Sequence, residues 1–294
     1  VGKKDSEIQF SIDNNISYLN SESFQEIEVI NKISSKSNKI TPISIRINPN
    51  IRTQTHKHIQ TGYRNNKFGI DINDLNEVID SVKKFDNIEI VGFHFHLGSQ
   101  INNNSPFLKL CTIANEVNDL FKAKLINIRY INVGGGLAID YSDPIGNSLS
   151  DFKKFISLFN NNIFLNDKQI LHFELGRSIV GQCGFLISKV LFTKKSYGKN
   201  YAIIDAGMND LIRPALYNTY HKVINITSKS LEKINYDVVG PVCESSDTFA
   251  YDYPLPLTNR DDFIVICSAG AYGQSMSSNY NLRNKLKSYY SDAI

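Results

Sequence analysis

The sequence lacks the features that mark several large classes of protein. Its net charge is only +3 over 294 residues, and lysine and arginine form no run longer than a pair such as Lys194-Lys195. Nothing therefore predicts a nucleic-acid or membrane-surface partner. No apolar run approaches the roughly 18 residues that a membrane helix needs, and no signal peptide opens the chain.

Cysteine is scarce, and its spacing excludes two further classes. No C-x-x-C pair occurs, so neither a zinc knuckle nor a dithiol redox motif is predicted. The four cysteines are Cys111, Cys183, Cys243 and Cys267. This usage favours a reducing, cytoplasmic compartment. Hydrophobic residues make up 41% and charged residues 21% of the chain, which is typical of globular proteins with a substantial core.

Strand-like and helix-like segments alternate up to about residue 184. The expected strands are 15–19, 42–48, 88–96, 128–133 and 169–175, and the expected helices are 22–34, 72–84, 106–122 and 149–160, the last three capped near Asn73, Ser105 and Ser150. This alternation predicts a parallel sheet. From residue 185 on, β-rich runs follow one another without comparable helices. We therefore expect an α/β domain over 1–184 and a mainly β domain over 185–294.

Polar or glycine-rich clusters stand where three successive expected strands end. They are His96-Leu-Gly-Ser99, Gly134-Gly-Gly136 and Glu174-Leu-Gly-Arg177. In a β/α barrel the carboxyl ends of the strands share the face that carries the active site. The pattern predicts a (β/α)8 TIM-type barrel, of which five strands are present, with a site built from these clusters.

The triple glycine and Glu174 each allow two interpretations. The backbone N–H groups of Gly134, Gly135 and Gly136 can close on a phosphate, or the glycines can serve only a tight turn. A carboxylate at the end of an apolar strand, such as that of Glu174, is costly to bury without a partner. Its partner is either a protonated heterocyclic nitrogen or Arg177 in a structural ion pair.

His94 and His96 stand two apart in FHFHLGSQI, so their side chains point to the same side of a strand. Two such histidines can bind a metal, but a third ligand of suitable type is not evident nearby, and we expect no metal site. We expect instead that one histidine stacks on a flat cofactor ring and that the other is satisfied within the barrel.

The second domain places polar residues in otherwise apolar or glycine-rich stretches. Arg213 and Tyr217, in IRPALY, indicate either a carboxylate site or a solvated loop. Cys243 stands beside Glu244 after a strand, and taken alone it is typical of a buried core thiol. Tyr272 lies in a loop rich in glycine and serine.

Seven segments occur in the order found in one family of enzymes. They are INPN…HKHIQTGYRNNKFGI (47–70), HFHLGSQI (94–101), NVGGGLAIDY (132–141), ELGRSIVG (174–181), DAGMNDLIRPALY (205–217), VVGPVCESSD (238–247) and GAYGQSMSSNYNLR (270–283). Together they make the chain resemble the diaminopimelate decarboxylases, which are pyridoxal-phosphate enzymes of the alanine-racemase-like fold (fold type III).

The resemblance implies a role for each cluster. His96 would stack on the pyridine ring of pyridoxal phosphate, and Glu174 would keep the ring nitrogen protonated so that the ring accepts the electrons left when CO2 departs. The phosphate would be surrounded by Ser99, Gly134, Gly135, Gly136, Gly176 and Arg177, with Tyr272 close by. The substrate would be bound by Arg177, Arg213, Tyr217, Glu244 and Tyr272. Cys243 would return a proton to the decarboxylated carbon, and Cys243 and Glu244 would serve the partner's site in a homodimer with shared active sites.

Two differences from the family pattern matter. Leu175 replaces the usual proline of Glu-Pro-Gly-Arg, which relaxes the turn without removing either charged residue. The family's Schiff-base lysine lies on the first barrel strand in a motif like Tyr-Ala-Lys-Ala-Asn, and no such motif occurs in this sequence. We expect Val1 to align just after the third barrel strand, and the natural protein to extend beyond both ends of the sequence.

The predicted reaction converts meso-2,6-diaminopimelate into L-lysine and CO2 in lysine biosynthesis. The rival within the same fold is a decarboxylase acting on ornithine, arginine or carboxynorspermidine. CES together with IRPALY favours diaminopimelate, because ornithine enzymes tend to carry Cys-Asp-Gly at the first of these positions. Two other hypotheses are a non-catalytic homologue that binds pyridoxal phosphate without the lysine, and a metal-dependent barrel hydrolase, which rests on the histidine pair alone.

Overall fold

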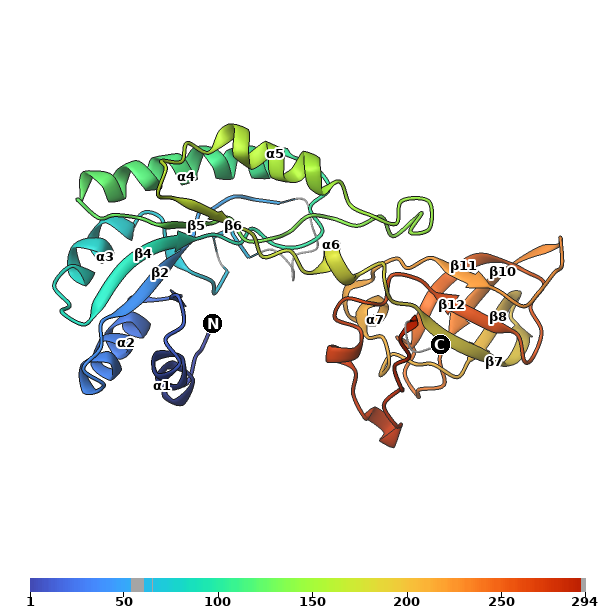
Figure 1. Cartoon of the computed structure of the whole chain (residues 1–294). Helices are drawn as coiled ribbons and strands as arrows, with labels where there is room; N and C mark the ends of the chain where they lie inside the picture. The colour runs from blue at the N-terminus through green and yellow to red at the C-terminus, as the bar shows by residue number, and fades with distance from the viewer. Residues whose placement is uncertain (54–60, 65, 292–294) are drawn as a thin grey trace. The chain divides into compact units, whose positions relative to one another are not determined.

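The structure is a computed structural model, which describes residues 1–53, 61–64 and 66–291 (Figure 1). Part of the segment 47–70 therefore lies outside the described residues. The chain divides into two compact units, Val1–Ala138 with Asp151–Leu175 and Ile139–Ser150 with Gly176–Ile294. The division falls before Gly176 rather than at residue 184, and the loop 139–150 joins the second unit. One reason is that Gln182 donates hydrogen bonds to carbonyl groups of this loop.

The first unit is built on a parallel sheet in the order β1-β2-β4-β5-β6, with β3 beside β2. Its strands are β1 (Leu19–Ser21), β2 (Thr41–Asn48), β3 (Ile70–Asp71), β4 (Ile88–His94), β5 (Tyr130–Asn132) and β6 (Ile170–His172). Its helices are α1 (Asp5–Asp13), α2 (Phe24–Lys36), α3 (Leu75–Val82), α4 (Ser105–Ala123) and α5 (Phe152–Asn162). The carboxyl ends of these strands therefore lie along one edge of the sheet.

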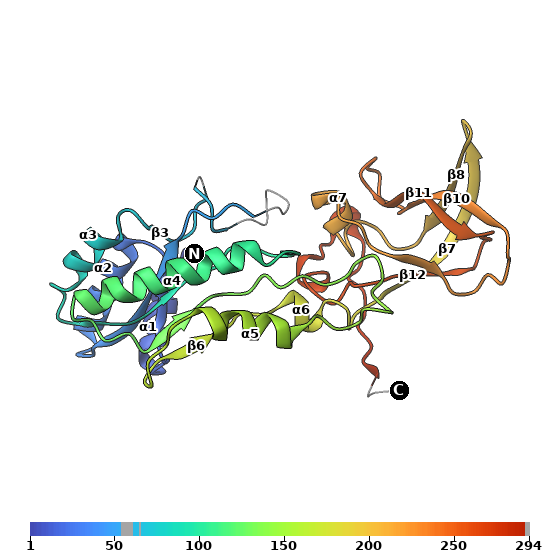
Figure 2. The same ribbon diagram turned by 90° about the horizontal axis from the view of Figure 1, so that it is seen from above.

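The core of the first unit lies between the sheet and its helices. Ile45 of β2 and Phe93 of β4 are fully buried, as are Ile30 of α2 and Phe121 of α4. The rings of Phe93 and Phe121 stack with their centroids 5.7 Å apart. Helices α4 and α5 lie side by side, as Figure 2 shows, and aromatic rings fill the space between them. The nearly continuous apolar run of β4 is thus explained by burial on both faces.

Some boundaries differ from those expected from the sequence. The first strand begins at Leu19 rather than at residue 15, because Asn15 (φ 50°) belongs to the turn that ends α1. The expected caps of the three later helices are each one residue away from the observed caps Asp74, Asn104 and Asp151. Asp151 caps α5 because its side chain accepts the Lys154 N–H at 2.9 Å.

The second unit contains a six-stranded sheet in the order β11-β10-β8-β7-β12-β9, antiparallel except between β8 and β10. Its strands are β7 (Leu186–Ser196), β8 (Lys199–Ile204), β9 (Val223–Asn225), β10 (Lys233–Val239), β11 (Thr248–Pro256) and β12 (Phe263–Ile266). Short helices are α6 (Arg177–Val180), α7 (Arg213–Tyr217), η2 (Gln274–Met276) and η3 (Tyr280–Leu282). Among the described residues, no helix has the length and apolar character needed to cross a membrane.

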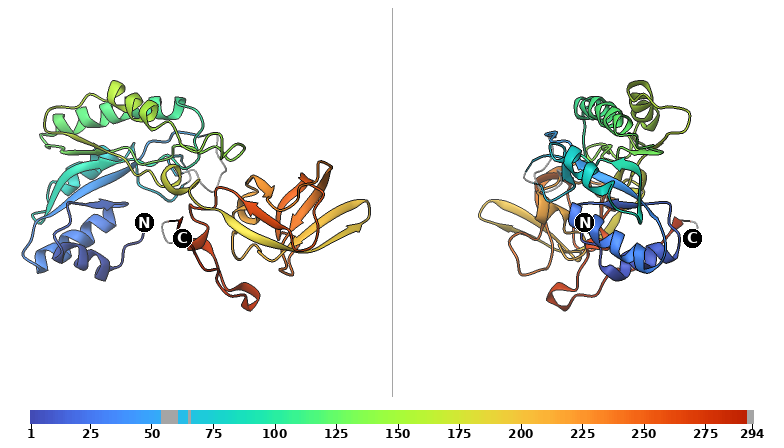
Figure 3. Two further views of the ribbon diagram at one scale, coloured as in Figure 1. Left: turned by 45° about the vertical axis from the view of Figure 1, so that its right-hand side comes forward. Right: turned by 90° about the vertical axis from the view of Figure 1, so that its left-hand side faces the viewer.

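Strands β7 and β8 form a long hairpin, which Figure 3 shows projecting from the sheet. Its two-residue turn, Tyr197-Gly198, has positive φ at both positions (48° and 81°). Turns of this kind match the twist of the two strands that they join. Residues such as Val190 and Ile204 alternate with outward-facing ones and fill a separate apolar core.

Candidate active site

The carboxyl edge of the parallel sheet brings Glu174 together with residues from two neighbouring strands. His94 ends β4 and pairs in register with Asn132, which ends β5. Glu174 follows β6, and its backbone N–H donates to Gly134 O at 2.8 Å. Glu174, the triple glycine and the histidines that end these three strands therefore meet in the first unit, as the sequence predicts for a parallel sheet.

Two hydrogen bonds hold the Glu174 carboxylate. Asn132 Nδ2 donates to Oε1 at 3.0 Å, and His94 Nε2 lies 3.2 Å from Oε2 and donates to it. Burial works to raise the pKa of Glu174, but the hydrogen bond and charge of His94, with smaller contributions from His96 and Asn132, lower it to about 2. Since the side chain is 41% exposed, this edge presents an ionised carboxylate that can take a cationic partner.

His96 is held as a neutral ring beside this carboxylate. Its Nδ1 accepts the Gly135 N–H at 3.2 Å, so that the neutral imidazole carries its proton on Nε2. Burial, the charge of Arg46 and that of His94 lower the pKa of His96 to about 4. Nδ1 lies 3.9 Å from Glu174 Oε2. A flat, neutral ring in this place suits stacking better than proton transfer.

The triple glycine makes a turn that a larger residue could not make. A Cβ on Gly134 (φ 71°) would lie 2.4 Å from Phe95 O, and one on Gly135 would lie 2.3 Å from Glu174 O. At Gly136 (φ 112°) it would lie 2.9 Å from Gly98 O, which precedes half-buried Ser99. The glycines thus let the turn approach the strand ends closely.

The amide groups of this turn are not all available to a ligand. Gly134 N donates to Asn132 Oδ1 at 2.9 Å, and Gly135 N donates to His96. Gly136 N has no acceptor among the described residues. From the sequence, the three amides are equivalent, but in the structure two of them donate to the side chains of Asn132 and His96 and orient them. Asn132 and the role of His94 were missed, although a polar residue at a strand end directly before three glycines is a signal.

In the second unit, Arg177 is buried among tyrosine side chains. Its Nη1 donates to Tyr141 Oη at 2.6 Å, and its guanidinium lies 5.0 Å from the ring centroid of Tyr272. A Cβ on Gly176 would lie 3.2 Å from Tyr272 Oη. The structure therefore brings together three residues expected around the phosphate and adds Tyr141, which sequence reasoning missed.

Arg213 is a second buried guanidinium in this unit. It is only 2% exposed and it lies over the Tyr217 ring at 5.3 Å, and its buried Nε has no hydrogen-bond partner among the described residues. Burial and the charge of Arg177 lower the pKa of Arg213, while Tyr141 opposes this shift. The solvated-loop interpretation of Arg213 is therefore wrong. A buried, incompletely bonded guanidinium is suited to a carboxylate ligand.

His221 is a buried, neutral side chain near Arg177 and Arg213. Its Nδ1 donates to Cys267 O at 2.9 Å, and its ring meets Tyr141 edge to face at 4.9 Å. Burial, together with the charges of Arg213 and Arg177, lowers the pKa of His221 to about 4. The site thus gains no third positive charge near pH 7.

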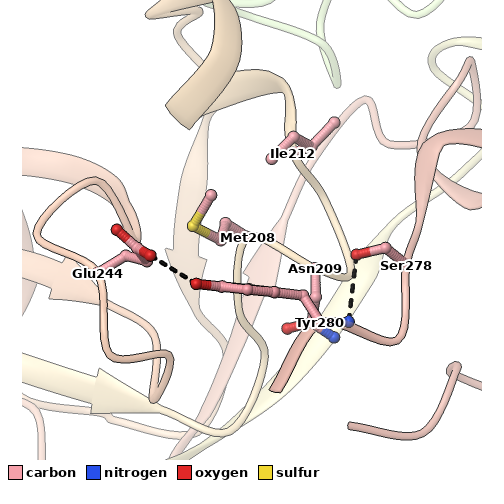
Figure 4. Close-up of a pocket in the computed structure, with 6 residues that line it drawn as sticks. All are labelled: Met208, Asn209, Ile212, Glu244, Ser278 and Tyr280. Carbon is pink, nitrogen blue, oxygen red and sulfur yellow. Dashed lines mark hydrogen bonds between the residues drawn. The ribbon is translucent and has the colours of Figure 1, made fainter. Parts of the chain in front are cut away.

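Glu244 lines a pocket of about 590 Å³ in the second unit, which Figure 4 shows. The six lining residues are Met208, Asn209, Ile212, Glu244, Ser278 and Tyr280. Tyr280 Oη donates to Glu244 Oε1 at 2.6 Å. The neighbouring Cys243 is exposed, which rules out the interpretation of this residue as a buried core thiol. Arg213 and Tyr217 are not among the lining residues.

Comparisons with known proteins decide the family. A family model described as the pyridoxal binding domain of the pyridoxal-dependent decarboxylases matches residues 1–181. The chain is also 48% identical to the diaminopimelate decarboxylase of Bacteroides thetaiotaomicron, over all of this chain and 76% of that protein. This chain belongs to the pyridoxal-dependent decarboxylases.

Solved decarboxylase structures place the chain within that family. The diaminopimelate decarboxylase of Helicobacter pylori complexed with L-lysine matches with a TM-score of 0.90 at 40% identity, over 97% of this chain and 71% of that one. The lysine/ornithine decarboxylase of Vibrio vulnificus has a TM-score of 0.80 at 18% identity, over 97% and 72%, and shares the fold alone. The expected fold, part of a β/α barrel followed by a mainly β domain, is confirmed.

Pyridoxal phosphate, the cofactor of these decarboxylases, fits the residues that are present. The ionised Glu174 suits a pyridinium nitrogen, neutral His96 suits an aromatic ring face, and the turn at Gly136 offers an amide to an anion. Leu175 stands where the decarboxylases usually have proline, yet Glu174 still makes both of its hydrogen bonds. Among the described residues, no group of three His, Cys, Asp or Glu side chains is placed to hold a metal.

Proposed function

We propose that this protein converts meso-2,6-diaminopimelate into L-lysine and CO2 with pyridoxal phosphate. The observation that carries the proposal is the Glu174 carboxylate, which is ionised and stands beside neutral His96 and the triple-glycine turn. Support for the substrate comes from the relative named diaminopimelate decarboxylase at 48% identity and from the relative solved with L-lysine at 40%.

The cofactor roles follow the chemistry of each residue. Pyridoxal phosphate supplies an electron sink for the bond that CO2 leaves, and this sink works best with a protonated ring nitrogen. Glu174 holds that proton on the ring, and His96 packs on the ring face. The phosphate is bound by Gly136 and by the set Ser99, Gly176, Arg177 and Tyr272, while Gly134 and Gly135 allow the close approach.

The substrate roles rest on charge. Arg213, with Arg177, Tyr217 and Tyr272, binds the distal carboxylate, since buried guanidinium groups favour an anionic ligand. Glu244 binds the distal ammonium, with its carboxylate oriented by Tyr280. Cys243, which is exposed beside Glu244, protonates the decarboxylated carbon. We further propose a cytoplasmic homodimer in which Cys243 and Glu244 serve the site of the partner.

The direct test is a substrate comparison with the purified full-length protein and added pyridoxal phosphate. We expect L-lysine to form from meso-2,6-diaminopimelate, detected by mass spectrometry, with far slower release of CO2 from L-ornithine, L-arginine and carboxynorspermidine. Faster turnover of L-ornithine would overturn the substrate assignment. Tight binding of the cofactor without turnover of any of these substrates would instead identify a non-catalytic homologue.

A further inference from the structure

Asn132 has a carboxamide whose two ends bind two different parts of the candidate site. The residue is 4% exposed at the end of β5. Nδ2 donates to Glu174 Oε1 at 3.0 Å, and Oδ1 accepts the Gly134 N–H at 2.9 Å. These two partners determine which end is the oxygen, because an ionised carboxylate accepts only and a backbone N–H donates only.

The result is a closed connection between the carboxylate and the glycine turn. Glu174 N also donates to Gly134 O, so the two residues are linked once through the backbone and once through the side chain of Asn132. His94 holds the other carboxylate oxygen at 3.2 Å. With one donor on each oxygen, the plane of the carboxylate is set relative to the turn.

We propose that Asn132 is a positioning residue, which holds the Glu174 carboxylate in the orientation that meets the cofactor's ring nitrogen and ties it to the turn that meets the phosphate. This inference rests on the proposed cofactor site. Buried hydrogen bonds of this kind rigidify a site because each leaves a costly unpaired group when it is broken.

The first test measures the carboxylate without any cofactor. In Asn132→Asp, the new side chain keeps an acceptor for Gly134 N but sets a second carboxylate beside Glu174. Two carboxylates this close share a proton, so carbon-13 NMR of labelled Glu and Asp will show the pair retaining a proton well above the pH at which wild-type Glu174 ionises. In Asn132→Leu, which removes the donor, the pKa of Glu174 will rise toward its usual value.

The second test measures binding of pyridoxine 5′-phosphate, which has the ring nitrogen and phosphate of the cofactor but no aldehyde. By calorimetry, we expect Asn132→Leu to weaken its affinity by about ten- to a hundredfold, the range for a hydrogen bond to a charged group. Asn48→Leu is the matched control, because Asn48 ends β2 in the same sheet and, within the described part of the chain, its side chain bonds to Tyr63 O and Asn50 N rather than to Glu174.

The outcomes separate this inference from the proposed function. If the Glu174 titration is unchanged in both Asn132 variants while thermal melting confirms that they fold, the positioning role is wrong. If the titration moves but pyridoxine 5′-phosphate binds Asn132→Leu as tightly as wild type, Asn132 tunes the carboxylate without positioning it for the ring, which also overturns the inference. Failure of the wild-type protein to bind the probe would count against the cofactor site itself, and the titration would still decide whether Asn132 holds Glu174.

Discussion

The two units differ in the sign of the charged side chains that line their candidate sites. In the first, one carboxylate, that of Glu174, is held by side-chain donors from His94 and Asn132. In the second, the guanidinium groups of Arg177 and Arg213 are buried among tyrosine side chains. The first arrangement is suited to a cation and the second to an anion. A pyridinium ring with a phosphate, acting on a substrate with carboxylates, supplies both kinds of partner, which is why this contrast supports the proposed decarboxylase.

The largest expected effect comes from neutralising the anion of the first unit. Glu174→Gln keeps the size of the side chain but removes its charge, so the ring nitrogen loses the group that holds its proton. We expect kcat to fall by about 10²- to 10³-fold, as when one preorganised electrostatic group is removed from an active site. Glu89→Gln, at an exposed pair with Arg129, is the control and should keep wild-type kcat. A kcat within twofold of wild type in Glu174→Gln would show that the charge of Glu174 is not needed for the reaction.

Removing a cation from the second unit should affect binding and stability in opposite directions. Arg213→Met is expected to raise KM about 100-fold, through loss of two charged hydrogen bonds to the substrate carboxylate. The melting temperature should stay constant or rise, because an apolar chain replaces a buried guanidinium whose Nε has no partner in the part of the chain that the structure describes. Arg129→Met serves as the exposed control. A lower melting temperature with unchanged KM would make Arg213 a structural residue.

A smaller effect, on inhibitor binding, is expected from changing Tyr141, which accepts a hydrogen bond from Arg177 and belongs to the loop 139–150. Tyr141→Phe removes one hydroxyl but keeps the ring that packs on His221. We expect about a tenfold weaker inhibition by L-lysine, which carries the distal carboxylate, and unchanged inhibition by 1,5-diaminopentane, which lacks it. Equal weakening of both inhibitors would show that Tyr141 acts on the fold rather than on the carboxylate.

The last expected effect concerns the pH dependence of stability rather than activity. Folding lowers the pKa of His96 from 6.5 to about 4, so between these values the unfolded chain binds more protons than the folded one. The contribution of His96 to stability is therefore present above pH 6.5 and is lost as the pH falls toward 4. Urea unfolding of His96→Asn should show a shallower loss over this window than wild type. An identical slope would mean that His96 is not held neutral by the fold.

The grouping of the site residues in the first unit can be predicted from the sequence. Parallel strands end at one edge, so His96, Gly134 and Glu174 could be brought together by counting strand ends. The hydrogen-bonding partners of the site residues could not be predicted in this way. Asn132 and Tyr141 stand inside the quoted segments, but an amide or a phenol has many possible partners, and only the folded backbone selects Glu174 for one and Arg177 for the other. For the same reason, sequence could not show that two of the three glycine amides orient side chains.

The central claim is that the Glu174 carboxylate meets the ring nitrogen of the cofactor. Nitrogen-15 NMR of ring-labelled pyridoxine 5′-phosphate bound to the protein at pH 8 tests it most directly. We expect a protonated ring nitrogen in the wild type and an unprotonated one in Glu174→Gln. An unprotonated nitrogen in the wild type, or the same protonated signal in both proteins, would contradict it.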